Sequence, residues 1–225
     1  MSGPSPPSAP RPRVVDEEPR SVRKRQAVLE AATTLFLRNG YLGTSMDEIA
    51  ALATVSKQTV YKAFSDKENL FSEIVVGAVD AAANPVHADV LVLEDTGDVE
   101  ADLRGFARRL LGRVMQPRIL QLRRLVIGEA GRFPELGRTF YEQGPGRTIA
   151  ALATVFERLA RRGVLQVDDP LLAAAHFNWL VMSIPLNQAM FLGDDEPPAS
   201  AELDRWADAG VRAFLAAYGR SQRAD

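Results

Sequence analysis

The sequence contains no cysteine and only two histidines, His87 and His176, among its 225 residues. Without cysteine the chain can form no disulfide, thiol nucleophile, iron–sulfur cluster or thiolate zinc site, and a reducing cytoplasm suits it. Two histidines far apart in the sequence are too few for a histidine metal cage. We therefore expect the protein to need neither a metal nor another cofactor.

Long uninterrupted apolar runs are also missing. The longest candidate, residues 177–192, is interrupted by Asn178, Ser183, Asn187 and Gln188, so it lacks the composition of a membrane span. The N-terminus is rich in proline and serine and contains no apolar signal-peptide core. These absences predict a cytoplasmic protein that does not bind a membrane.

The chain has no strong charge of either sign, because its formal net charge is −2. Charge alone therefore does not indicate nucleic-acid binding. The placement of the basic residues is more informative, since several cluster between Arg20 and Arg25, and Lys57 and Lys62 fall on one short predicted helix. The enzyme motifs GxSxG, P-loop, HExxH and GxGxxG are absent, so we expect no catalytic residues.

Apolar residues recur with helical spacing through most of the chain, and no strand pattern of useful length appears. The sequence therefore predicts an all-α fold of about nine or ten helices. Residues 1–19 are rich in proline and serine and poor in apolar side chains, which predicts a disordered tail. The predicted helices span residues 20–39, 46–52, 57–63, 66–83, 99–115, 117–130, 134–142, 147–162, 169–192 and 199–218.

Local signals define several of these helix ends. Gly40 follows the first helix and suits a left-handed cap, because glycine adopts that conformation at low cost. Asn84 and Pro85 predict the end of the fourth helix and a loop over residues 85–97. Two capping boxes are predicted, one from Ser45 with Glu48 and one from Ser65 with Glu68.

The segment from Met46 to Phe64 has the pattern of a helix-turn-helix. Two short helices meet through a tight turn, and Ala50 supplies the small residue needed where they touch. Thr54 stands at a turn position that favours glycine, and a β-branched residue at positive φ there costs about 1 kcal/mol or more. Two short surface helices packed on a core are the alternative interpretation. The outer face of the second helix carries Lys57, Gln58, Thr59, Tyr61 and Lys62.

Short motifs follow one another in register between Arg25 and Phe71. They are Ala31-Ala32 with Leu35-Phe36, Gly40-Tyr41, Thr44-Ser45, Ile49-Ala50, Val55-Ser56-Lys57, Tyr61 with Phe64, Lys67-Glu68 and Leu70-Phe71. In this order and spacing the stretch resembles the DNA-binding domain of the TetR/AcrR family of bacterial transcription regulators along its whole length. Thr54 and Ala63 are the two departures from the family pattern.

The resemblance implies a DNA-binding domain over residues 20–66 and a ligand-binding and dimerisation domain over residues 67–220. It implies that the first turn of the second helix holds a phosphate, and that Lys67 meets phosphate at the start of the fourth. Gln58 is the expected base reader, because its amide can pair bidentately with adenine. For Tyr61, core packing of the ring is the alternative. The implied DNA contacts are Thr44, Ser45, Ser56, Lys57, Gln58, Thr59, Tyr61, Lys62 and Lys67.

Residues 122–192 also resemble the C-terminal domain of an AefR-like subgroup of the family. Members dimerise through their last two long helices, which here correspond to residues 169–192 and 199–218. The first of these is apolar nearly all round, and such a helix must be buried on all sides. A partner subunit would cover the face that its own domain leaves open, and an ordinary monomeric core is the alternative.

The same resemblance implies a small-molecule pocket among the helices between residues 99 and 192. Pockets of this kind are mostly apolar with a few placed polar groups. Core packing is the alternative for each aromatic or methionine at helical spacing. The candidate lining residues are Met115, Phe133, Phe140, Phe156, His176, Trp179, Met182 and Met190.

These observations predict a ligand-responsive transcriptional regulator, a repressor, that binds palindromic double-stranded DNA as a homodimer. Two alternatives stay open. A ligand-independent DNA-binding protein would show the same helix-turn-helix, and an all-helical protein-interaction module would show the same bundle. Salt-sensitive retention of a short palindromic duplex separates a DNA-binding protein from an interaction module or an enzyme.

Overall fold

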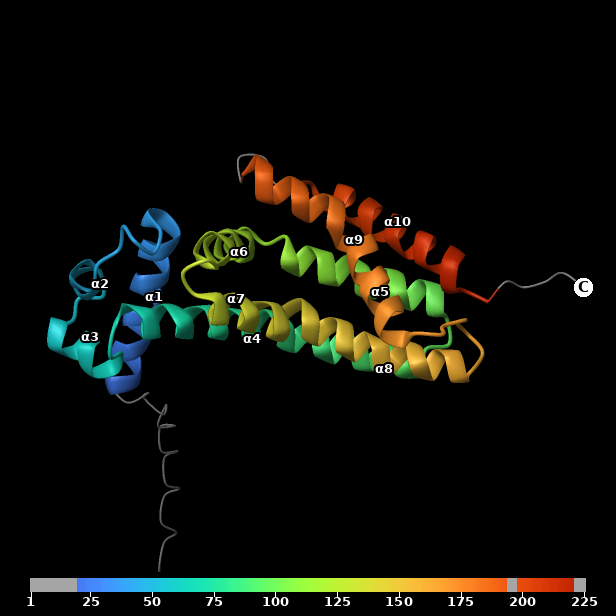
Figure 1. The fold of residues 1–225 in the computed structure, drawn as a ribbon, viewed down its shortest axis with the longest axis horizontal. Coiled ribbons are helices and arrows are strands. Elements are labelled where there is room, and N and C mark those ends of the chain that lie inside the picture. Colours follow the sequence, from blue (N-terminus) through green and yellow to red (C-terminus); the bar gives the residue numbers. More distant parts are fainter. Residues whose placement is uncertain (1–19, 194–197, 221–225) are drawn as a thin grey trace, which may run out of the picture.

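The computed structural model describes residues 20–193 and 198–220, and this part of the chain is all-helical (Figure 1). The predicted tail at residues 1–19 and most of the 193–198 linker lie outside the described residues. Within those residues the only bridge between extended segments joins Leu165 to Gly219. The helices are α1 (Arg20–Asn39), α2 (Met46–Leu52), α3 (Lys57–Ala63), α4 (Lys67–Val92), α5 (Val99–Val114), α6 (Pro117–Glu129), α7 (Pro134–Tyr141), α8 (Arg147–Arg161), α9 (Pro170–Leu192) and α10 (Ser200–Tyr218), with a 3₁₀ turn η1 (Leu93–Asp95) and a π-helical turn η2 (Glu142–Gly146).

The first capping box is confirmed and the second is wrong. At α2, Glu48 donates its backbone N–H to the Ser45 hydroxyl, and the Glu48 carboxylate accepts from the Ser45 backbone N–H. At α4 the N-cap is Asp66, whose carboxylate accepts from the backbone N–H of Asn69 at 2.8 Å. An aspartate directly before the helix is as good a cap as a serine one residue earlier, and here it takes that role.

Helix α4 does not end at Pro85, and residues 85–97 are not a loop. The helix continues through this proline to Val92. Proline in a helix interior costs about 3 kcal/mol, but Val86, Val90 and Leu93 beyond it are all buried. Each of these side chains contributes about 1.5–3 kcal/mol when fully buried, so packing outweighs the local cost.

The continuation makes α4 long and apolar enough to span a membrane by length and composition, contrary to the expectation from the sequence. Its mean hydropathy over the relevant window is 1.3, and 33% of that window is buried. Six of the buried side chains of α4 pack into two protein cores: Leu70, Phe71, Ile74 and Val75 in the first, and Val86 and Val90 in the second. The helix therefore connects the two ends of the elongated molecule in Figure 1.

The first core extends beyond α1 to α4. Leu122 and Val126 of α6 and Leu136 of α7 are buried in it. The ring of Phe133 lies 4.8 Å from that of Tyr41 and 6.0 Å from that of Phe71, measured between centroids. Two helices of the larger C-terminal region are thus packed directly against the N-terminal helices.

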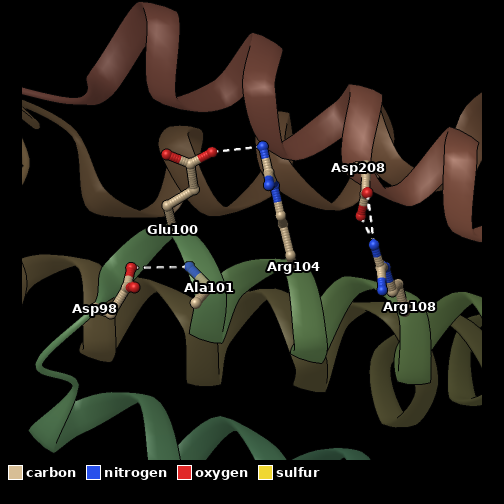
Figure 2. A network of polar contacts seen from close by, with 6 residues as sticks. All are labelled: Asp98, Glu100, Ala101, Arg104, Arg108 and Asp208. Carbon is tan, nitrogen blue, oxygen red and sulfur yellow. Dashed lines mark hydrogen bonds and ion pairs between the residues drawn. The ribbon is translucent and has the colours of Figure 1, made fainter.

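The second core is formed mainly by α5, α8, α9 and α10. Helices α9 and α10 cross at close range, because a Cβ placed on Gly210 would lie 2.8 Å from the carbonyl oxygen of Leu180. Helix α5 is joined to α10 by an ion pair in which Arg108 donates two hydrogen bonds to Asp208, at 2.8 and 2.6 Å (Figure 2). The Arg108 hydrogen bonds lower the pKa of the Asp208 carboxyl below its usual value.

Candidate nucleic-acid interface and internal cavity

Helix α3 has an exposed polar face, and the opposite face of the helix is buried and fixes its position. Val60 of α3 and Phe64 at its C-cap are fully buried in the first core. Gln58, Tyr61 and Lys62 are exposed, and their i, i+3 and i+4 spacing places them on one side of the helix. An amide, a phenol and an ammonium therefore project together from a helix whose position is fixed by packing.

The turn between α2 and α3 has the strained backbone that the sequence predicts. Thr54 has φ of 55°, and it is the only non-glycine residue with positive φ in the described part of the chain. The backbone N–H of Val55 then donates to the carbonyl of Ala50 at 3.1 Å, which closes the turn. Since Thr54 is exposed, this geometry is imposed by the flanking helices rather than by burial of its side chain.

Several hydroxyls predicted to contact DNA are engaged inside the domain. Thr44 is buried and donates to the carbonyl of Gly40 at 2.9 Å. Ser56 caps α3 by accepting from the backbone N–H of Thr59 at 3.2 Å, and the hydroxyls of these two residues lie 2.8 Å apart. These three residues shape the helix ends, and any phosphate contact from them has to be made alongside these bonds.

Ser45 remains exposed while it caps α2. Hydrogen bonds from its hydroxyl and its backbone N–H lower the pKa of the Glu48 carboxyl below its usual value. Glu48 is therefore charged at neutral pH. Its position in the first turn of α2 suits the positive end of the helix dipole, and it places a negative charge next to the predicted phosphate contact.

Two of the predicted lysine contacts, Lys57 at the start of α3 and Lys67 at the start of α4, have different partners in the structure. Lys57 forms an exposed ion pair with Asp47, with 2.6 Å between Nζ and Oδ2. Such surface pairs contribute little to stability, so this ammonium can exchange Asp47 for a phosphate. Lys67 instead donates to the carbonyls of Tyr41 and Thr44 at 2.9 and 2.8 Å, and its ammonium lies 4.4 Å from the centroid of the Tyr41 ring. Lys67 thus holds the α1–α2 loop onto α4, a role that the sequence does not predict.

A small cavity, partly open to the surface, lies between the two cores. Its volume is about 60 Å³, well below the roughly 300–1,000 Å³ of typical small-molecule sites. The π-helical turn η2 forms part of the wall, where Gly144 approaches Val79 of α4. The lining residues come from α4 to α9 and are Ala78, Val79, Ala82, Ala83, Val86, Leu110, Val114, Ile119, Leu122, Arg123, Phe140, Gly144, Pro145, Thr148, Asn178 and Met182.

Of the predicted pocket residues, Phe140 and Met182 line this cavity and the others do not. Phe133 belongs to the aromatic cluster of the first core, and Phe156 is fully buried against Phe177 and Phe214 in the second. His176 is exposed and lies 2.6 Å from the Tyr218 hydroxyl. The remaining three also lie elsewhere: Met115 beside a separate groove near the start of α6, Trp179 on the exposed side of α9, and Met190 packed against the second core.

The cavity instead contains two polar side chains that were not selected from the sequence. Arg123 is largely buried, and burial lowers the pKa of its guanidinium from the usual value. Asn178 is fully buried, and neither its amide nitrogen nor its oxygen has a hydrogen-bond partner. A signal was present for Arg123, since Ile119, Leu122 and Val126 place it at the i+4 position of an apolar helical stripe.

Sequence comparisons match both regions of the chain. The family model described as bacterial regulatory proteins, tetR family, matches residues 28–74, and the model of the AefR-like transcriptional repressor C-terminal domain matches residues 101–220. The chain is 48% identical over 54 residues to the uncharacterized HTH-type transcriptional regulator YhgD of Bacillus subtilis, which is 24% of this chain and 28% of that protein. It is 36% identical over 84 residues to the DNA-binding transcriptional repressor TetR of Mycobacteroides abscessus, or 37% and 40% of the two chains. The chain therefore spans less than half the length of these curated relatives.

Solved structures extend the similarity to nearly the whole chain. A TetR-family regulator from Mesorhizobium loti has 45% sequence identity and a TM-score of 0.82, covering 90% of this chain and 100% of its own. The flavonoid-responsive regulator FrrA has 36% identity and a TM-score of 0.67 at the same coverage. Together with the two family models and the exposed polar face of α3, these matches establish that the chain belongs to the TetR family of bacterial transcriptional regulators, with an AefR-like C-terminal domain.

Proposed function

We propose that the protein is a cytoplasmic, ligand-responsive repressor that binds a palindromic operator as a homodimer. The observation that carries the proposal is the exposed face of α3, where Gln58, Tyr61 and Lys62 project from a helix anchored by buried Val60 and Phe64. A helix in this setting can enter the major groove and present side chains to base edges. We propose no catalytic activity for the protein.

The roles on α3 follow from side-chain chemistry. The Gln58 amide can donate to and accept from adenine, so it reads sequence. The Lys62 ammonium and the Tyr61 hydroxyl suit phosphate, which positions the domain without reading sequence. Ser45 and Lys57 supply further phosphate contacts at the edges of α2 and α3, whereas Thr44, Ser56 and Thr59 contribute by fixing the helix ends.

The homodimer is proposed from the exposed side of α9. Leu172, Trp179, Leu180, Ile184 and Phe191 recur along one side of this helix and are all exposed, Phe191 by 85%. Contiguous apolar surface of this kind marks an interaction site. A two-fold pairing of α9 and the neighbouring α10 with their copies would cover it, as in the isologous interfaces of most dimers.

The coupling between effector and DNA is proposed to run through α4 and α6. The successive buried residues of α4 lie in the first core, along the cavity and in the second core. Helix α6 places Leu122 both in the cavity wall and in the core of the DNA-binding helices. A ligand that enlarges the cavity would therefore move both helices and change the spacing of the two α3 helices, by an amount set by its differential affinity for the two conformations.

The proposed function is tested by selecting bound fragments of genomic DNA at two salt concentrations and sequencing them. We expect a short palindromic site whose recovery falls as salt rises. Gln58→Ala should relax the base preference within the site, while Lys62→Met should weaken all sequences alike. Failure to enrich any sequence at either salt concentration would contradict the proposal.

A further inference from the structure

We propose that the effector is an apolar molecule with a single anionic group, such as a carboxylate, which pairs with Arg123 and accepts a hydrogen bond from Asn178 inside the cavity. This inference rests on the proposed function, because it names the ligand class of the same regulator. Each of the two side chains supplies an independent reason, and the walls of the cavity supply a third.

Arg123 is a largely buried cation with no anion of the described residues paired to it. Its Nε has no hydrogen-bond partner, and burial alone shifts its pKa, with no carboxylate contributing. Its guanidinium carbon lies 5.3 Å from the centroid of the Phe140 ring, which orients the group within the cavity wall. Arginine stays protonated in proteins, and a buried charge is normally paired. The missing partner is therefore an anion from outside the described residues, and we assign that role to the ligand.

Asn178 is a neutral side chain that also lacks hydrogen-bond partners. Its side chain is fully buried in the middle of α9, with both polar amide atoms unpaired. A buried amide without partners costs about 1–3 kcal/mol, and native proteins rarely retain such groups without a reason. The amide NH₂ can donate to the oxygen that Arg123 binds, so one anionic ligand group gives both side chains a hydrogen-bond partner.

The rest of the lining is mostly apolar and carries no negative charge, which disfavours a cationic ligand. None of the cavity residues is acidic, and its walls consist mainly of alanine, valine, leucine, isoleucine and methionine side chains. A cationic ligand would face Arg123 without a counter-charge, and a neutral ligand would leave that guanidinium unpaired. The apolar walls favour a hydrocarbon or aromatic body attached to the anion.

The cavity is too small for such a ligand and has to widen on binding, and the structure indicates where. A groove of about 750 Å³ between α1, α4 and α6 shares Ala78, Ala82, Ile119 and Leu122 with the cavity wall. Two of these four are alanines, so little side-chain volume separates the two spaces. A ligand whose anionic end sits at Arg123 can extend its apolar body toward this groove, between α4 and the α6 segment that contacts the DNA-binding helices.

The test uses isothermal titration calorimetry of the full chain with two acids, octanoate and cinnamate, and their uncharged amides, octanamide and cinnamamide. Octylamine is the cationic control. We expect at least one acid to bind about tenfold or more tightly than its amide, and octylamine not to bind. Binding of the amine or an amide as tightly as the matched acid would overturn the proposal, as would the absence of binding by both acids.

Three variants locate the site. Arg123→Met keeps much of the side-chain volume and should abolish the preference for the acid over the amide, whereas Arg123→Lys should retain it. Asn178→Leu should weaken acid binding severalfold while raising the melting temperature of the free protein, a combination that a purely structural residue would not give. Unchanged acid binding in both Arg123→Met and Asn178→Leu would overturn the assignment even if either variant is less stable.

The same samples are tested for retention of the selected operator duplex. If the original chain binds neither acid but retains the duplex sequence-specifically, the ligand class alone is overturned. Acid binding without any DNA retention would contradict the proposed function and support the ligand site. The two proposals therefore fail in distinguishable ways.

Discussion

The ammonium of Lys67, in the first turn of α4, donates to the carbonyl oxygen of Thr44 at 2.8 Å. It also donates to the carbonyl of Tyr41, so one side chain fixes the loop that precedes α2. Replacing Lys67 by Met leaves both carbonyls without this donor. Since hydrogen bonds from charged groups contribute about 1.5–3 kcal/mol, we expect Lys67→Met to lower the free energy of unfolding by about 2 kcal/mol.

The matched control for that change is Lys62→Met on the exposed face of α3. It removes the same charge but no internal hydrogen bond, so its stability should stay within about 0.5 kcal/mol of the original chain. Urea unfolding monitored by circular dichroism measures both variants. Equal stability of the two would show that the Lys67 contacts do not hold the loop.

Thr54→Gly should stabilise the protein. A non-glycine residue in the left-handed region costs about 1–2 kcal/mol, and glycine loses about 0.5–1 kcal/mol through its greater freedom in the unfolded chain. The relief of backbone strain is the larger of the two effects, so we expect the free energy of unfolding, measured with urea, to rise by about 0.5–1 kcal/mol. A lower stability would mean that the Thr54 side chain makes favourable contacts that outweigh its φ of 55°.

Gly210→Ala and Gly112→Ala should have opposite effects. A Cβ at Gly210 would lie 2.8–2.9 Å from backbone atoms of Leu180 and Val181, which cannot rotate away. Overpacking of this kind costs about 1–3 kcal/mol. At Gly112, on α5, nothing lies within 4 Å, so alanine should add up to about 1 kcal/mol through helix propensity.

Thermal unfolding of the two alanine variants gives the comparison. The melting temperature should fall for Gly210→Ala and rise for Gly112→Ala. A rise in both would show that α9 and α10 separate easily and that their close crossing is not needed for the fold.

Asp208 gives the fold a predictable dependence on pH. Its pKa is lowered mainly by the hydrogen bonds from Arg108, so the ionised form is favoured in the folded state (Figure 2). The resulting stabilisation is present above the pKa of about 3.9 of the unfolded chain and is lost as the pH falls through the lower folded value. The stability difference between the original chain and Asp208→Asn should thus be constant from about pH 5 to 8 and shrink below about pH 4.

Urea unfolding of both proteins across that pH range measures the difference directly. Arg108→Gln is the control for the partner of this ion pair. In the Arg108→Gln background, adding Asp208→Asn should no longer change the stability in a pH-dependent way, because the hydrogen bonds that lower the pKa of Asp208 are already lost. A difference that grows as the pH falls below 4 would contradict the assigned sign.

Local signals on short segments predicted much of the DNA-binding region. The Ser45–Glu48 box, the left-handed Gly40 and the strained turn at Thr54 depend on neighbouring residues only, and each is present in the structure. The end of α4 was not predictable in this way. Pro85 carries a strong local stop signal, and only the burial of residues beyond it explains why the helix continues.

The cavity residues were hard to predict for a related reason. Aromatic residues such as Phe133 and Phe156 have the pattern of both pocket and core, and in this fold they fill two cores. Arg123 and Asn178 are polar residues on apolar helices, and composition alone gives their burial low weight. Their role becomes visible only when six helices and η2 bring them to one cavity.

The most direct test of the central claim is a hydroxyl-radical footprint on the selected operator, made with the original chain and with an Ile184→Asp variant of the exposed α9 face. The account predicts two protected half-sites about 10–10.5 base pairs apart, both lost together in a variant that sediments as a folded monomer. A single protected half-site, or an unchanged footprint from the monomeric variant, would contradict a regulator that binds DNA as a homodimer through α9.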